Sequence, residues 1–155
     1  MRRISLLFTF CLWACAASAE WTQESGDVDA IASDAGNTIK DEYARNDVTP
    51  RMSFQCAPGS GVTARIDWGR FISSFSTEVG FKVDDGKFMW LKWKVDGSEK
   101  VTLSPSADDT ARLTAAMREG NTLTVDVSPY SEGPVVVTFD LTGFADALAT
   151  LESGC

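Results

Sequence analysis

The stretch VVVTFDLTGFADALATLESGC, residues 135–155, is the segment around which the chain is organised. Residues 135–141 are mostly apolar and β-branched, which predicts a buried strand. Thr142 is expected to cap a short helix directly after that strand. One apolar stripe follows the helix and consists of Phe144, Leu148 and Leu151. The stretch therefore predicts a strand that leads into a helix packed on a β-sheet.

Residues 1–19 have the pattern of a secretory signal peptide. Arg2 and Arg3 precede an apolar run, and Ala17-Ser18-Ala19 forms an A-x-A cleavage site. The run is too short for a comfortable membrane span, and no later stretch has the length and apolarity of one. We therefore expect an exported periplasmic chain without a transmembrane segment. A lipoprotein anchored through Cys15 is the alternative.

The cysteines predict one disulfide. Of the four cysteines, Cys11 and Cys15 lie in the signal peptide. Cys56 and Cys155 then remain in an oxidising compartment, where a pair of thiols is expected to form a bond. This bond would close nearly the whole domain into one loop. A reactive thiol or a metal pair is the alternative, and both need reduced sulfur.

Composition excludes several classes of function. The chain has 14 Lys and Arg against 22 Asp and Glu, a net charge of −8 that becomes about −10 without Arg2 and Arg3. Such a balance argues against binding to nucleic acid or to anionic lipid. The chain has no histidine, which excludes Ser-His-Asp and Cys-His catalysis and His-ligated zinc. No cofactor and no metal is predicted.

After the signal peptide, we expect an irregular N-terminal segment, residues 20–50, and a disulfide-closed β domain, residues 51–155. The first segment is polar and rich in Gly, Asp and Asn, which favours loops with at most an edge strand and a helical turn. The second contains about seven short alternating segments and two helices, the first opened by Ser104-Pro105-Ser106 and stopped by Gly120. This pattern predicts a mainly β (α+β) fold, a compact antiparallel β-sandwich or half-open barrel with the C-terminal helix packed on the sheet.

The hairpin around Asp84-Asp85-Gly86 fixes its own register. A three-residue loop with Gly86 in the left-handed conformation pairs Phe81 with Met89 and gathers the apolar residues on one face. The other face then carries a candidate binding strip of Lys82, Phe88, Trp90, Lys92 and Lys94. An apolar, basic strip on an acidic protein is typical of a surface that binds an envelope protein partner or, alternatively, a small molecule or glycan. A second layer, such as the N-terminal segment, is the competing explanation for the aromatic residues.

A pair of carboxylates, as in glycoside cleavage, is the remaining route to catalysis. The candidates are Asp67, Glu78, Asp84, Asp85, Asp108 and Asp109. Turn formation, helix initiation or cross-strand pairing with Lys92 explains most of these carboxylates without catalysis. The acidic residues Asp27, Asp29 and Asp34 lack the spacing of a calcium loop. We therefore expect a protein that is not an enzyme, with a carboxylate-dependent hydrolase as the alternative.

Three motifs occur together between Arg51 and Cys155. They are Ile66-Asp67-Trp68-Gly69, the turn at residues 84–86, and residues 129–134 followed by the Phe-Asp-Leu-Thr-Gly ending and a cysteine. In this combination the chain resembles the TagO/VasI family of periplasmic proteins associated with type VI secretion. The resemblance implies a β domain that acts as an accessory module of the cell envelope, and it carries over no catalytic residue. Lys82 departs from the family pattern, where an arginine is expected.

Overall fold

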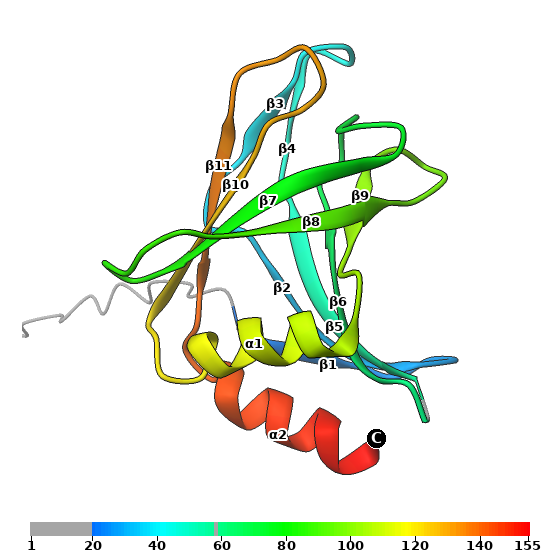
Figure 1. The fold of residues 1–155 in the computed structure, drawn as a ribbon, viewed down its shortest axis with the longest axis vertical. Coiled ribbons are helices and arrows are strands. Elements are labelled where there is room, and N and C mark those ends of the chain that lie inside the picture. Colours follow the sequence, from blue (N-terminus) through cyan, green and yellow to red (C-terminus); the bar gives the residue numbers. More distant parts are fainter. Residues whose placement is uncertain (1–19, 58) are drawn as a thin grey trace, which may run out of the picture.

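The computed structural model describes residues 20–57 and 59–155, so the predicted signal peptide and Cys15 lie outside the described residues. One antiparallel sheet of nine strands dominates the described part, in the order β1-β2-β5-β6-β9-β8-β7-β10-β11 (Figure 1). The strands are β1 (Thr22–Glu24), β2 (Asp29–Asp34), β5 (Arg51–Ala57), β6 (Gly61–Asp67), β7 (Ser76–Val83), β8 (Met89–Val95), β9 (Val101–Leu103), β10 (Thr122–Val127) and β11 (Val135–Asp140). A separate hairpin consists of β3 (Ile39–Asp41) and β4 (Asn46–Val48), and the helices are α1 (Ala107–Met117) and α2 (Phe144–Gly154).

The sheet curls until its two ends meet. The backbone N–H of Gly36, just after β2, donates to the carbonyl of Thr138 in β11 at 2.8 Å. The Asn37 side chain donates to the Val136 carbonyl at 3.1 Å and accepts from the Thr138 N–H at 2.9 Å. Trp21 adds an indole hydrogen bond to the Asp140 carbonyl. The mainly β prediction is confirmed, and the single curled sheet corresponds to the half-open barrel and not to a sandwich of two sheets.

The interior of the curled sheet is filled by aromatic and branched side chains. Trp68 and Trp93 are fully buried, as are Phe54, Phe81, Phe139 and Phe144. In β10, Leu123, Val125 and Val127 point inward and the residues between them are less buried, the period of two expected for a half-exposed strand. The Trp68 indole donates to the Thr102 hydroxyl at 3.0 Å, so this buried polar group has a partner.

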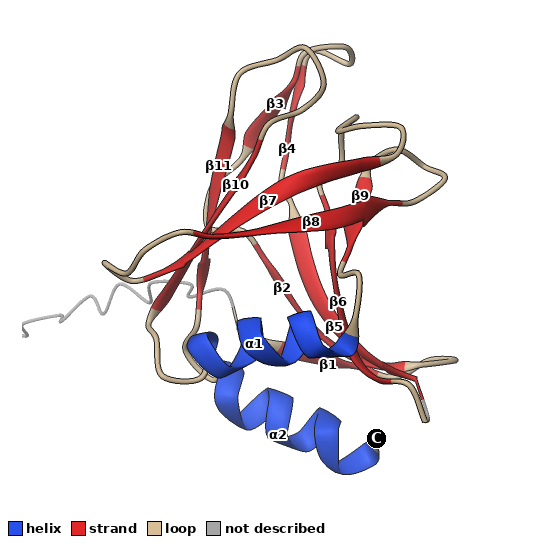
Figure 2. Cartoon of the chain, in the orientation of Figure 1, coloured by secondary structure: helices blue, strands red, loops and turns tan. Residues whose placement is uncertain are grey.

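The two helices lie together at one end of the curled sheet (Figure 2). Helix α1 begins where predicted, because the Ser106 side chain accepts a hydrogen bond from the Asp109 N–H. Helix α2 contacts β2 and β5 through its predicted stripe, Phe144, Leu148 and Leu151. Thr142 is not its cap, which corrects the prediction: Gly143 holds that position with φ 77°. The Thr142 N–H instead donates to the Asp140 carboxylate, which forms a turn before the helix.

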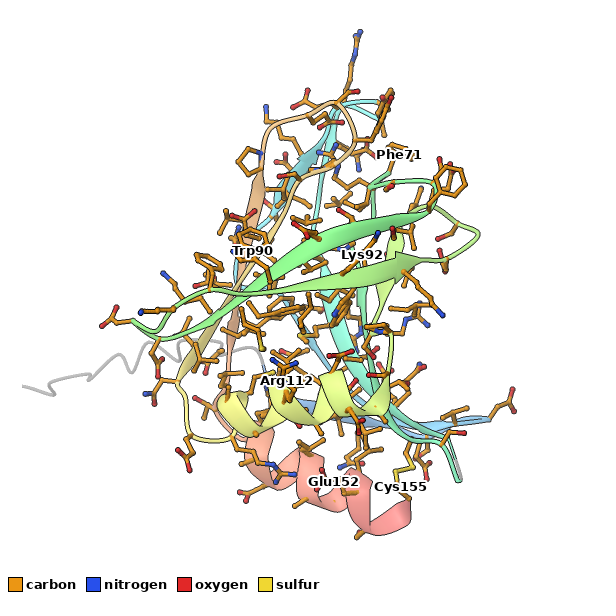
Figure 3. All side chains as sticks on the ribbon, viewed as in Figure 1. Phe71, Trp90, Lys92, Arg112, Glu152 and Cys155 are labelled. Atoms are coloured by element: carbon orange, nitrogen blue, oxygen red, sulfur yellow. A yellow bond between two sulfur atoms is a disulfide. The ribbon has the colours of Figure 1, made fainter. Side chains whose placement is uncertain are left out.

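The predicted disulfide is confirmed. Cys56 in β5 and Cys155 after α2 are joined, with Cα atoms 5.6 Å apart and a sequence separation of 99 (Figure 3). Cys56 is buried, whereas Cys155 is exposed. The bond therefore ties the end of the C-terminal helix to the end of β5, the third strand in the sheet order.

Residues 20–50 are more regular than their composition suggests, since they contribute β1 to β4. Strand β2 pairs along its whole length with β5, and its Ala30, Ile31 and Ala32 are all buried. Such a strand has no polar face, so it lacks the alternation that marks a half-buried strand. Helix α2 packs on the Ile31 side of this strand, since Ile31 pairs with Phe54, whose ring contacts Phe144 of α2.

The β7–β8 hairpin has the predicted register. Phe81 pairs with Met89 and Val79 with Leu91. The residue in the left-handed conformation is Asp84, with φ 47°, and not Gly86. Asp84 is held there because its carboxylate accepts hydrogen bonds from the backbone N–H groups of Asn121 and Thr122. This contact joins the hairpin tip to the chain that enters β10.

Candidate functional site

The predicted strip lies on the outer face of β7 and β8, and we call it the β7–β8 strip. It consists of Lys82, Phe88, Trp90, Lys92 and Lys94, and Figure 3 shows Trp90 and Lys92 along the hairpin. No segment of the described part of the chain forms a second layer over it, because Phe88 is 37% and Trp90 50% exposed. The explanation that the N-terminal segment covers these aromatics is therefore wrong: β1 pairs with β2 at the other end of the sheet order.

The two aromatic side chains of the strip support each other. The Phe88 and Trp90 rings stack with centroids 5.5 Å apart and an interplanar angle of 27°. The Lys82 ammonium lies 5.3 Å from the centre of the Phe88 ring, within the range of a cation–π contact. Phe88 therefore contacts both Lys82 and Trp90, and its packing holds the indole in place.

Trp90 occupies space that Gly80 leaves open. The two residues are paired across β7 and β8, and a Cβ atom on Gly80 would lie only 2.8 Å from Cη2 and Cζ3 of the indole. On the other side of Gly80, β10 places Asp126, which pairs in turn with Val136 of β11. Trp90, Gly80, Asp126 and Val136 therefore form one row across four strands of the outer face.

Asp126 has an unusual environment in this row. Its Oδ1 atom is buried and has no hydrogen-bond partner among the described residues. Burial raises the pKa of the Asp126 carboxyl, because desolvation disfavours the ionised form. This residue could not be identified from the sequence, since its position beside Gly80 depends on the pairing of β7 with β10.

A shallow groove lies next to Trp90. It has a volume of about 400 Å³ and is lined by Thr77, Glu78, Trp90 and Ser128. Glu78 is directly opposite Lys92 in the β7–β8 register. Within the described residues, neither Glu78 nor any lysine of the strip forms an ion pair. These charged groups are therefore available to a bound molecule.

The other candidate carboxylates mostly have structural partners. Asp67 accepts from the Gly69 N–H, Asp84 holds the hairpin tip, and Asp109 accepts from the Ser106 hydroxyl. Asp34, considered for calcium, forms an ion pair with Arg51 at 2.7 Å. Among residues 20–57 and 59–155, no group of three or more His, Cys, Asp or Glu side chains is placed to hold a metal ion.

One buried charge was not predicted at all. Arg70 is 2% exposed and forms an ion pair with Glu132 at 2.5 Å. It also donates to the Lys40 carbonyl in β3, so one side chain joins the β3–β4 hairpin to two loops at the end of the sheet opposite the helices (Figure 1). Three exposed aromatic residues, Tyr43, Phe75 and Tyr130, lie in these loops. Residue spacing gives no signal for the pair, because Glu132 is 62 positions from Arg70.

Comparison with known proteins identifies the family. Residues 75–152, about half of the chain, match a family model described as invasion associated locus B (IalB) protein. The fold is similar to the crystal structure of invasion associated protein b from Bartonella henselae, with a TM-score of 0.56 and 19% sequence identity. That similarity covers 88% of this chain and 94% of the Bartonella chain, and at this identity it concerns the fold alone. No sequence among curated proteins matches the chain.

These matches correct the TagO/VasI assignment, and with it the association with type VI secretion. The motifs behind that resemblance have local structural roles: Asp67 and Asp140 close turns, and Gly143 takes the left-handed conformation before α2. Such turns recur in unrelated β proteins, so they do not define a family. In the described part of the chain, no helix has the length and apolar character needed to cross a membrane. With its disulfide-bonded β fold and a family match over residues 75–152, the chain belongs to the IalB family.

Proposed function

We propose that this protein is an exported, non-catalytic interaction module that binds a component of the cell envelope through the β7–β8 strip. The observation that carries the proposal is the stacked, half-exposed Phe88–Trp90 pair on a chain of net charge −8. Large aromatic side chains that stay exposed and rigid are typical of binding surfaces, because little conformational entropy is lost when they are covered.

The charged side chains around the Phe88–Trp90 pair also support the proposal of a binding surface. Lys82, Lys92 and Lys94 surround the aromatic residues and form no ion pair within the described part of the chain. A basic patch on an acidic molecule orients the approach of a partner with negative charge. Catalysis has less support, since Asp67, Asp84 and Asp109 are engaged in turns and caps.

A periplasmic location fits the proposal. A disulfide that closes 99 residues requires an oxidising compartment, and the predicted signal peptide would deliver the chain there. The family is described as invasion associated, which is compatible with an exported chain that works by contact and not by turnover.

The test is a mild cross-linking capture of the tagged chain in its own bacterium, followed by mass spectrometry of the captured envelope components. Trp90→Ala should abolish the capture of a component that the wild type retains. Tyr43→Ala is the matched control, because Tyr43 is 75% exposed but lies on the β3–β4 turn, away from the strip. Circular dichroism of each variant checks that the fold persists.

Equal capture by the wild type and Trp90→Ala would refute the proposal. If Trp90→Ala unfolds the domain, Lys92→Glu provides the second variant, since Lys92 is exposed and its change reverses a charge without removing packing. Unchanged capture by Lys92→Glu together with unchanged capture by Lys94→Glu would also count against the strip.

A further inference from the structure

The exposed surface of Trp90 is fixed before any ligand binds. The indole packs over the Gly80 backbone and stacks on Phe88, yet half of its surface stays accessible. Among the described residues the other tryptophans, Trp21, Trp68 and Trp93, are at most 5% exposed. Trp90 is therefore a preorganised aromatic platform, which suits a ligand with one flat apolar face.

The surroundings of this platform are polar. The polar residues Thr77, Glu78 and Ser128 line the neighbouring groove, and the Glu78 side chain lies on the same face of the sheet as Trp90. A protein hot spot is usually enclosed by a wide apolar surface that excludes water. Among the described residues, only Phe88 and Val136 add large exposed apolar side chains on the same face. One aromatic ring beside several hydrogen-bonding groups matches a pyranose, which has an apolar C–H face and a rim of hydroxyls.

The charges select among saccharides. Three lysines, Lys82, Lys92 and Lys94, face two carboxylates on this side of the sheet, Glu78 and Asp126, and none of the five forms an ion pair in the described part of the chain. Glu78 lies opposite Lys92 in the strand register, which leaves an excess of positive charge on the strip. A ligand that carries carboxylate, phosphate or sulfate groups gains from this excess, whereas a neutral sugar does not.

We propose that the groove at Trp90 binds an acidic saccharide. The sugar ring stacks on the indole, its hydroxyls form hydrogen bonds with Glu78 and Ser128, and its acidic group lies near Lys92. This inference rests on the proposed function, because it names the ligand class of the same strip.

The test uses the indole N–H signals of the ¹⁵N-labelled, disulfide-bonded chain in NMR titrations. The probes are trigalacturonate and a hyaluronan tetrasaccharide, with the methyl ester of trigalacturonate as the uncharged counterpart of the first. We expect at least one acidic probe to shift the Trp90 signal while the signals of Trp21, Trp68 and Trp93 stay in place. The ester should bind about tenfold more weakly than the acid, and Lys92→Glu should remove that difference.

Two results would overturn the inference. One is the absence of any Trp90 shift with both acidic probes at millimolar concentration. The other is equal affinity for trigalacturonate and its ester, which would exclude charge recognition. Trp90→Ala should bind neither probe, and Tyr43→Ala should bind as the wild type does.

The outcome separates this inference from the proposed function. If the probes do not bind but the cellular capture still depends on Trp90, the saccharide inference is wrong and the proposed function as an interaction module is retained. If capture does not depend on Trp90 either, both are wrong. If trigalacturonate competes with the cellular capture, the natural ligand is a saccharide of the protein's own envelope. If the probe binds without competing, the saccharide site lies on a different surface from the one that captures the envelope component.

Discussion

Replacement of Cys155 by serine tests how much of the stability depends on the disulfide. Cys155 is exposed and its sulfur is bonded to the buried Cys56, so the change to serine opens the loop and removes almost no packed surface. Helix α2 should stay in place, because Phe144, Leu148 and Leu151 remain buried against the sheet. Burial of each such side chain contributes about 1.5–3 kcal/mol.

The magnitude follows from the size of the loop. The bond closes a 99-residue separation, and for a loop of that length the chain-entropy model gives about 4.7 kcal/mol at 25 °C. In a domain of this size, a loss of 1 kcal/mol lowers Tm by roughly 3–4 °C. Cys155→Ser should therefore lower Tm by roughly 15 °C in a single transition.

Thermal unfolding followed by circular dichroism measures this loss, with urea unfolding as the second measurement. The wild type in the presence of a reductant should melt at the temperature of Cys155→Ser, and the reductant should not change the variant further. Ser153→Ala, at the same end of α2, is the control that keeps the bond and should melt as the wild type does. A wild-type Tm that is insensitive to reductant would show that the disulfide does not stabilise the fold, and a Cys155→Ser variant that melts in two separate steps would contradict the expected single transition.

Three other substitutions test particular contacts. Arg70→Met removes the buried partner of Glu132 and should lower the free energy of unfolding by about 3 kcal/mol in urea denaturation, and a loss below about 1 kcal/mol would mean that the pair does not hold the loops. Gly80→Ala should displace the Trp90 indole, which alters the indole NMR signal and weakens the cellular capture. The free energy of unfolding should change by less than about 1 kcal/mol, because the exposed ring is able to move. Asp126→Asn should raise Tm at about pH 7, because burial raises the pKa of the Asp126 carboxyl and its ionised form destabilises the wild-type fold. Towards about pH 4 the wild-type carboxyl becomes protonated, so the variant should lose this advantage. An identical Tm of the two proteins at neutral pH would contradict this expectation.

The sequence was sufficient wherever one element carries its own signal. The alternation on both sides of residues 84–86 set the β7–β8 register, and Ser106 marked the start of α1. Residues 20–50 gave no such signal. Strands β1, β3 and β4 have three residues each, too short for a period to show, and β2 is buried at four successive positions.

The candidate site was predictable to the same extent. The phase of the hairpin placed Phe88 and Trp90 outward, and both are exposed. Asp126 could not be linked to Trp90 from the sequence, because the link runs through Gly80 and requires that β10 lie beside β7. The same limit applies to Arg70, whose partners come from strand β3 and from a distant loop. Side chains that meet only through the order of the strands leave no local pattern.

The amide of Asn37 has a consequence for solubility. It both donates to and accepts from the backbone of β11, as the peptide group of a neighbouring strand would. An uncovered strand edge is a template for pairing with another molecule, which leads to aggregation. By occupying Val136 and Thr138, this side chain and the Gly36 N–H keep the last strand from recruiting a second copy. A single polar residue in a turn thus protects the protein against the intermolecular β-pairing to which open sheets are prone.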